Sequence, residues 1–524
     1  MTVNRREFLQ KAGLGALQLG LVSYFANSTV AGVLKTGQLP RSLPELQGVK
    51  SSGIIDFIAA VETKKLNLHS LMILRHGKIL AEGWWAPYQA DLKHTLYSLS
   101  KSFTSSAIGF AVNEGKLSVN DKVISFFPDQ VPAEISANLG NMKVQDLLTM
   151  RTGHAKDSTP ALREGTDPNW VKSFLAYPVE HEPGTFFVYN SGATYMLSAI
   201  IQKLTGQTLL EYLTPRLFVP LGIEGADWEV DPNGVNTGGW GLRVKTEDIA
   251  KFGQLYLRKG VWDGKRLLPE KWIDEATSAH VPTKGTESDW EQGYGYQFWR
   301  CRHNAYRGDG AFGQYCIVMP EKDMVVAITS ESGDMGAIMN ELWKHVLPAV
   351  QESSLSEKGA QAQLKQKLSS LALPVPVAKN SAAGVSKINN QKYIFDNNDL
   401  KINSVSFNFG SEGCVFKLSD GGGEHTITNG IGKWKTGKTD LSILPLKLVS
   451  TPVPGEKETR IAAAGTWVDD NTFEMIWRFT ETAHYDTVVC KFDGDNINVR
   501  FERSLAIINN VEDTRPELIG KRVG

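Results

Sequence analysis

Residues 96–105 read LYSLSKSFTS, and within them Ser98 and Lys101 lie three positions apart. The apolar run Ala107 to Val112 follows, so we predict a helix from about Leu99 to Asn113. Residues three apart on a helix share a face. A serine hydroxyl needs a neighbouring base to act as a nucleophile, and a lysine in an apolar setting can lose its proton near neutral pH. The spacing therefore predicts a nucleophile and its base on one helical face.

The composition is that of an ordinary globular protein with more than one domain. The chain has 524 residues, of which 41% are hydrophobic and 22% charged, and its formal net charge is −1. This charge gives no reason to expect nucleic acid or an anionic surface as a partner. The four cysteines include no Cys-x-x-Cys pair, so we expect neither a structural metal site nor a disulfide framework.

Residues 1–31 read as a twin-arginine export signal. Arg5 and Arg6 precede a Phe-Leu pair, an uncharged stretch runs from Ala12 to Asn27, and small residues follow around Ser28 to Ala31. The apolar part is shorter than the roughly 20 residues of a spanning helix. An N-terminal amphipathic helix is the alternative. We expect a periplasmic or secreted bacterial protein with no stable membrane span after signal cleavage.

The remaining pattern predicts a mixed α/β (α+β) domain followed by an all-β domain. In the first, residues 45–350, the expected elements include a hairpin at Leu71 to Trp85, strands at Tyr294 to Arg300, Gln314 to Met319 and Met324 to Thr329, and a closing helix at Met335 to Val350. Residues 351–385 are rich in Ser, Ala, Gln and Lys and predict a linker. Residues 386–508 alternate with period two, which predicts an antiparallel β domain, a small barrel or sandwich.

A downstream stretch, PGTFFVYNSG at residues 183–192, contains Tyr189 and resembles the second motif of the serine β-lactamase and penicillin-binding-protein superfamily. LLTMRTG at 147–153, GGWGL at 238–242 and FGQY at 312–315 fit the same superfamily. The resemblance covers about residues 50–350. The nearest branch is the class C β-lactamase-related group, which includes esterases, D-amino-acid peptidases and hydrolases of nylon-type linear amides such as the 6-aminohexanoate dimer. It implies an antiparallel sheet flanked by helices.

The resemblance also implies roles for three residues. Ser98 would be the acylated nucleophile, and Lys101 would hold or relay its proton. Tyr189 would be the general base, with its pKa lowered by the lysine, and later the proton donor to the leaving group. Acyl transfer further needs hydrogen-bond donors for the oxyanion, and the backbone N–H of a serine at a helix N-terminus is one such donor.

Two departures from the family pattern narrow the expected substrate. Ser191 stands where the second motif usually has an asparagine, with Asn190 one place early, and we expect both to line the substrate pocket together with Trp240. The third motif is usually Lys-Thr-Gly or His-x-Gly. We expect Gly308-Asp309-Gly310 to occupy its place, with Ala311 N–H as the second oxyanion donor; a literal Lys435-Thr436-Gly437 in the β-rich tail is the alternative.

A site without a cationic group at Gly308 should bind a substrate carboxylate less well, which favours neutral esters or amides over penicillins. The sequence thus predicts a serine hydrolase that forms an acyl-enzyme on Ser98 and cleaves a small-molecule ester, linear amide or peptide bond without a cofactor. A β-lactamase or D-Ala-type carboxypeptidase is the alternative, and a non-catalytic binding or sensor protein of the same fold is an alternative of another class. No Gly-x-Ser-x-Gly or His-Glu-x-x-His occurs, which disfavours an α/β-hydrolase and a zinc protease.

Overall fold

A computed structural model of the protein describes residues 37–282, 285, 287–356, 359–377, 385–441, 447–448 and 451–523, all within one compact unit. The predicted export signal at residues 1–31 lies outside these residues. Over the described part of the chain, no helix is both long and apolar enough to cross a membrane.

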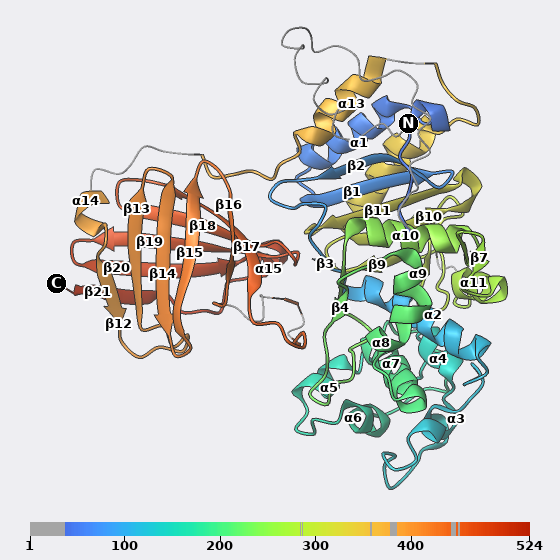
Figure 1. The fold of residues 1–524 in the computed structure, drawn as a ribbon. Coiled ribbons are helices and arrows are strands. Elements are labelled where there is room, and N and C mark those ends of the chain that lie inside the picture. Colours follow the sequence, from blue (N-terminus) through green and yellow to red (C-terminus); the bar gives the residue numbers. More distant parts are fainter. Residues whose placement is uncertain are drawn as a thin grey trace, which may run out of the picture. The chain divides into compact units, whose positions relative to one another are not determined.

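A six-stranded antiparallel sheet forms the frame of the N-terminal domain. Its order is β2-β1-β11-β10-β9-β8, so the first hairpin of the domain pairs with the last one (Figure 1). The strands are β1 (Leu68–Arg75), β2 (Lys78–Trp84), β8 (Trp299–Arg300), β9 (Tyr306–Gly310), β10 (Gln314–Met319) and β11 (Met324–Ser330). The predicted hairpin at residues 71–85 and the two strands after residue 314 are confirmed.

Strand β1 is buried along its whole length because helices cover both faces of the sheet. Leu71 and Ile73 face the cluster of α1 (Ser51–Thr63), which α13 (Gly359–Ser369) extends. Met72 and Leu74 face the opposite cluster, around α10 (Thr246–Leu257) (Figure 1). This arrangement explains why the strand reads as a continuous apolar run rather than an alternating one.

Helix α2 (Ser100–Asn113) crosses the centre of the helical region, and its residues 100–111 are all buried. It packs on α7 (Ser191–Thr205), the helix that follows the second motif. The other helices of this domain are α3 (Ala137–Asn141), α4 (Val144–Leu148), α5 (Thr159–Glu164), α6 (Trp170–Ala176), α8 (Leu209–Leu213), α9 (Val219–Leu221), α11 (Glu270–Thr277) and α12 (Met335–Glu341). Short strands β3 (His94–Thr95), β4 (Asp227–Trp228) and β5 (Leu242–Val244) form a small sheet, and β6 (Val261–Trp262) pairs with β7 (Lys265–Arg266).

Three predicted boundaries differ from the structure. The expected strand at residues 294–300 is reduced to β8, because Gly293 and Gln297 have positive φ values of 105° and 66° that break an extended run. The α-helical part of the expected closing helix is α12, which ends at Glu341. A π-helical turn and then a 3-10 turn continue the chain to Ala349. Part of the predicted linker is α13, whose Leu364 is buried in the α1 cluster.

The C-terminal domain is a ten-stranded sheet in the order β15-β14-β13-β12-β21-β20-β19-β18-β17-β16, and β15 also pairs in parallel with β17. Its strands are β12 (Lys392–Phe395), β13 (Ser404–Gly410), β14 (Gly413–Asp420), β15 (Gly423–Ile431), β16 (Lys435–Thr439), β17 (Thr459–Trp467), β18 (Thr472–Phe479), β19 (Tyr485–Asp493), β20 (Asn496–Arg503) and β21 (Leu518–Val523), with helices α14 (Val385–Ile388) and α15 (Ser504–Asn509). The all-β prediction is confirmed. The sheet extends to β21, past the predicted end at residue 508.

Candidate active site

Ser98 lies in a tight turn, Tyr97–Leu99, directly before α2. Tyr97 and Leu99 are buried while Ser98 is half-buried, so the serine stays accessible to solvent. Tyr97 has a φ of 46°, a left-handed conformation that costs a non-glycine residue about 1–3 kcal/mol. The serine therefore sits on a strained turn at the positive end of a helix, where developing negative charge is stabilised.

Lys101 projects from the first turn of α2 into an almost dry environment, with 1% of the residue exposed. Its Nζ lies 3.0 Å from Ser98 Oγ, 2.9 Å from Ser191 Oγ and 2.7 Å from the Gly239 carbonyl oxygen. Burial lowers the pKa of Lys101 to about 7, although the nearby carboxylate of Asp157 opposes this shift. The amine is thus substantially neutral near pH 7.

A neutral lysine amine has two N–H donors and one lone pair, and Lys101 has three hydrogen-bond partners. The Gly239 carbonyl can only accept, so it takes one N–H. Ser191 Oγ can accept the second N–H, which leaves the lone pair for the Ser98 O–H. With this assignment the lysine is oriented to remove the proton of the serine hydroxyl.

Tyr189 lies beside the lysine, with Lys101 Nζ 4.9 Å from its ring centroid, and it stacks on Trp299 at 5.7 Å between centroids. Although the residue is only half-buried, desolvation of the phenol raises its pKa, and the negative charge of Asp309 adds to the rise. A hydrogen bond with Ser98 acts in the opposite direction and is outweighed. The expected lowering of the Tyr189 pKa is therefore wrong, because desolvation outweighs the opposing positive charge of Arg307.

The three residues expected to line the pocket have different environments. Ser191 contacts Lys101, as described above. Asn190 is fully buried: it caps α7 by accepting a hydrogen bond from the Ala193 N–H at 3.3 Å, and it also accepts one from the Ser158 hydroxyl at 2.9 Å. Trp240 is 4% exposed, so neither it nor Asn190 presents a surface to a substrate. Only Ser191 of the three is placed to act at the site.

The predicted third motif lies on β9, which runs against the start of α2. A Cβ at Gly308 would fall within 2.5 Å of Leu99 Cδ1 and closer still to Ser102 Oγ. A Cβ at Gly310 would collide with the backbone of Leu96, so the strand can approach only because both residues are glycines. This contact brings Ala311 next to the turn that carries Ser98.

Asp309, between the two glycines, is buried in an ion pair with Arg307 at 2.8 Å. Burial raises the pKa of Asp309, while Arg307 lowers it. The alternative motif, Lys435-Thr436-Gly437, forms part of β16, where Lys435 pairs with Glu412 at 2.9 Å on the surface of the C-terminal sheet. Of the two candidates, only the β9 sequence adjoins the serine turn.

Three further residues at the site had no signal in the sequence. Asp157 accepts a hydrogen bond from the Ser191 N–H at 3.1 Å, Trp299 stacks on Tyr189, and Arg307 neutralises Asp309. Each of these residues is brought to the site by a loop or a strand that lies far from Ser98 in the sequence. Gly239, by contrast, lies within the GGWGL stretch quoted above, but its role as an acceptor for Lys101 depends on a backbone carbonyl that no side-chain pattern reports.

Comparison with known proteins agrees with this fold. The Beta-lactamase family matches residues 60–351. The 6-aminohexanoate-dimer hydrolase of Paenarthrobacter ureafaciens is 25% identical over 51% of this chain and 73% of its own length. The lovastatin esterase of Penicillium rubens is 26% identical over 36% of this chain and 55% of its own length, and the D-aminopeptidase of Brucella anthropi is 26% identical over 30% and 31%.

The fold and these relatives define the class as serine hydrolases related to β-lactamases. The chain belongs to the Beta-lactamase family, and the match covers the domain that holds Ser98, Lys101 and Tyr189.

Proposed function

We propose that the protein cleaves an ester or a linear amide or peptide bond through an acyl-enzyme on Ser98. The observation that carries this proposal is the environment of Lys101, whose amine has a pKa lowered to about 7 and lies 3.0 Å from the serine oxygen. A base with a pKa near the operating pH is the most effective proton acceptor. We therefore assign the general-base role to Lys101 rather than to Tyr189.

In the acylation step, Ser98 Oγ attacks the substrate carbonyl carbon while its proton passes to Lys101 Nζ. The tetrahedral oxyanion accepts hydrogen bonds from the N–H groups of Ser98 and Ala311. The bond from carbon to the leaving oxygen or nitrogen then breaks, and the leaving group takes up a proton from Tyr189. Lys101 returns a proton to the phenol. Water then attacks the acyl-enzyme ester on Ser98, with the same proton transfers in the reverse order. This step releases the acyl group as an acid and regenerates the serine.

The substrate we propose is a neutral ester or a linear amide rather than a β-lactam. Gly308 offers no cation for a substrate carboxylate, and Arg307 is already paired with Asp309. Ser191 presents a hydroxyl in place of an amide. The relatives named for a linear amide and for an ester support the same two bond types.

The test combines active-site labelling with a substrate panel. Purified protein is treated with a fluorophosphonate probe beside Ser98→Ala, and turnover is measured on short-chain aryl esters, linear peptides, aminohexanoate oligomers and a chromogenic cephalosporin. We expect labelling that Ser98→Ala abolishes, and turnover of an ester or a linear amide. Equal labelling of both proteins would overturn the nucleophile assignment. Turnover of the cephalosporin alone would favour the β-lactamase alternative, and labelling without turnover the binding protein.

We also propose that the protein is exported by the twin-arginine route, on the basis of Arg5, Arg6 and the apolar stretch that follows. Fusing residues 1–31 to a reporter that is active only after export in a folded state tests this. Export should be lost when both arginines are replaced by lysine. Export that persists in that variant would contradict the proposal.

A further inference from the structure

The turn between β18 and β19 of the C-terminal domain contacts the residues that lead into Ser98. The Thr95 N–H donates to the Glu481 carbonyl at 3.1 Å, and the Tyr88 hydroxyl donates to the Thr482 carbonyl at 3.3 Å. His484, the last residue of the turn, is fully buried. The C-terminal domain thus meets the N-terminal domain just before the nucleophile.

His484 links two residues of the N-terminal domain. Its Nε2 lies 2.5 Å from the Tyr97 hydroxyl, and its Nδ1 lies 2.7 Å from Glu331 Oε1. Tyr97 is the residue directly before Ser98, and Glu331 directly follows β11. Tyr97 and Glu331 are 3% and 0% exposed, so water cannot substitute for these contacts.

The groups in this series of hydrogen bonds have complementary donors and acceptors. The Leu448 N–H donates to the Tyr97 oxygen at 3.3 Å. The phenol can then donate its own proton to His484 Nε2, and the proton on Nδ1 is donated to the Glu331 carboxylate. Each polar hydrogen has an acceptor in this assignment, which fixes both the imidazole and the phenol in one orientation.

The same histidine also packs against the loop that carries the second oxyanion donor. The ring of Phe312 lies 5.0 Å from His484 and 5.6 Å from Tyr97, both edge to face. Ala311 packs on this cluster, which includes Ala483 of the β18–β19 turn. One side chain of the C-terminal domain therefore touches the residues beside both proposed oxyanion donors, Ser98 and Ala311.

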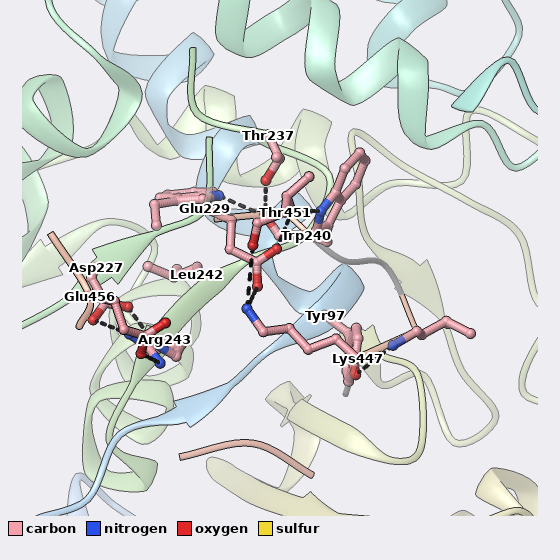
Figure 2. A network of polar contacts seen from close by, with 12 residues as sticks. Tyr97, Asp227, Glu229, Thr237, Trp240, Leu242, Arg243, Lys447, Thr451 and Glu456 are labelled. Carbon is pink, nitrogen blue, oxygen red and sulfur yellow. Dashed lines mark hydrogen bonds and ion pairs between the residues drawn. The ribbon is translucent and has the colours of Figure 1, made fainter. Parts of the chain in front are cut away.

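A second contact from the C-terminal domain reaches the lysine side of the site. The Trp240 indole N–H donates to Thr451 Oγ1 at 2.9 Å, and Thr451 in turn bonds Glu229, which pairs with Lys447 at 2.6 Å (Figure 2). The residue before Trp240 is Gly239, whose carbonyl accepts from Lys101. The C-terminal domain thus contacts residues next to Ser98 and next to the Gly239 carbonyl that binds Lys101.

We propose that His484 of the C-terminal domain is a positioning residue for the nucleophile: through Tyr97 it holds the strained turn that sets Ser98 against Lys101 and the oxyanion donors. This inference rests on the proposed function, since it assigns the support of the same serine. Left-handed backbone at a non-glycine residue persists only where the surroundings over-determine it. The His484 contact and the Phe312 packing supply that determination.

The experiment measures the rate of fluorophosphonate labelling and the kcat and KM for an aryl ester on the full chain. Tyr97→Phe removes only the hydroxyl, His484→Gln removes the imidazole, and the double variant combines them. His425→Gln is the matched control, because His425 also bonds two partners, Asp420 and Asp440, within the C-terminal sheet and away from Ser98. The final labelled fraction counts folded protein, so the rate reports on positioning alone.

We expect each single variant to lower kcat and the labelling rate about tenfold with KM within about twofold, the size of one lost buried hydrogen bond. The double variant should lose no more activity than the less active of the two single variants, because both changes break the same contact between Tyr97 and His484. His425→Gln should match the wild type. Wild-type rates in both single variants, or losses that multiply, would overturn the inference alone. A wild-type protein that does not label at Ser98 would overturn the proposed function and this inference with it.

Discussion

Two buried lysines of this protein differ in what surrounds them. Lys101 in the N-terminal domain is 1% exposed, and Lys447 in the C-terminal domain is 8% exposed. Lys447 pairs with the carboxylate of Glu229 at 2.6 Å. Among the described residues, the hydrogen-bond partners of Lys101 are uncharged oxygens from Ser98, Ser191 and Gly239.

The difference shows what makes a buried amine a base. Removal from water disfavours the ammonium form, and a carboxylate in contact restores it. Lys101 lacks that contact, and its pKa falls to about 7. Lys447 has such a contact, and its pair with Glu229 joins the two domains. Burial by itself therefore does not mark a catalytic lysine; burial without an adjacent counter-charge does.

Replacing Lys101 by methionine should give the largest effect. Without the base, labelling and ester turnover should fall about 100- to 10,000-fold, the usual contribution of general-base catalysis. The fold should remain, since methionine fills the same apolar space. Stopped-flow labelling with circular dichroism on the same sample measures both. Activity retained within tenfold would show that another group accepts the proton.

Replacing Lys447 by methionine should instead destabilise the protein. The Glu229 carboxylate would be left buried and unpaired, at a cost of about 3–5 kcal/mol in the free energy of unfolding. Burial already raises the pKa of Glu229, and Lys447 opposes that rise. Lys447→Met combined with Glu229→Gln should recover most of the loss in urea denaturation.

Lys438→Met is the control for this stability measurement. Lys438 also pairs with a glutamate, Glu458, but both side chains are more than half exposed. An exposed pair contributes about 0–1 kcal/mol. Equal losses from the Lys438 and Lys447 variants would contradict the contrast between the two environments.

The pH dependence of activity should report the Lys101 amine. Below its pKa of about 7 the ammonium form has no lone pair, so kcat/KM for a neutral ester should fall about tenfold for each pH unit below that value. The rate should rise through pH 7 and level off above it. An acid limb centred several pH units lower would instead show that Lys101 is not the group that accepts the proton.

Ser191→Ala should have the smallest effect, because it removes one of three partners of Lys101 and leaves its burial intact. We expect kcat to fall about threefold to tenfold, as for the loss of one neutral hydrogen bond. Ser125→Ala, at an exposed serine whose hydroxyl donates to the Lys122 carbonyl of its own turn, is the control and should leave kcat unchanged. A loss above 100-fold would give Ser191 a direct part in proton transfer.

The sequence predicted those features that local patterns determine. The hairpin of β1 and β2, the helix after Ser98 and the strands β10 and β11 each follow from periodicity and turn residues within one short segment. The strand expected at residues 294–300 failed because the left-handed conformation at Gln297 is set by its surroundings rather than by its residue type. Helix α13 lies in a segment whose polar composition concealed one buried face.

The proposed catalytic residues could be singled out because their spacing is itself a motif, whereas their environments could not be predicted from the sequence. The raised pKa of Tyr189 depends on desolvation by strands and loops from elsewhere in the chain. The glycines at 308 and 310 could be read as missing functional groups, but only the packing of β9 on α2 shows that no side chain fits there. His484 lies far from Ser98 in the chain and adjoins it only through the domain interface.

The last strand, β21, pairs with both β12 and β20, so it joins the beginning of the C-terminal sheet to its end. During synthesis, this strand leaves the ribosome after the other helices and strands of the described residues. When Ser98 and Lys101 have been synthesised, the β18–β19 turn has not. The strand that joins the two ends of the sheet is synthesised later still. Clipping before Leu518 would likewise remove the strand that joins β12 to β20 and weaken the C-terminal sheet, so that, under the proposed role of His484, the activity at Ser98 should depend on an intact β21.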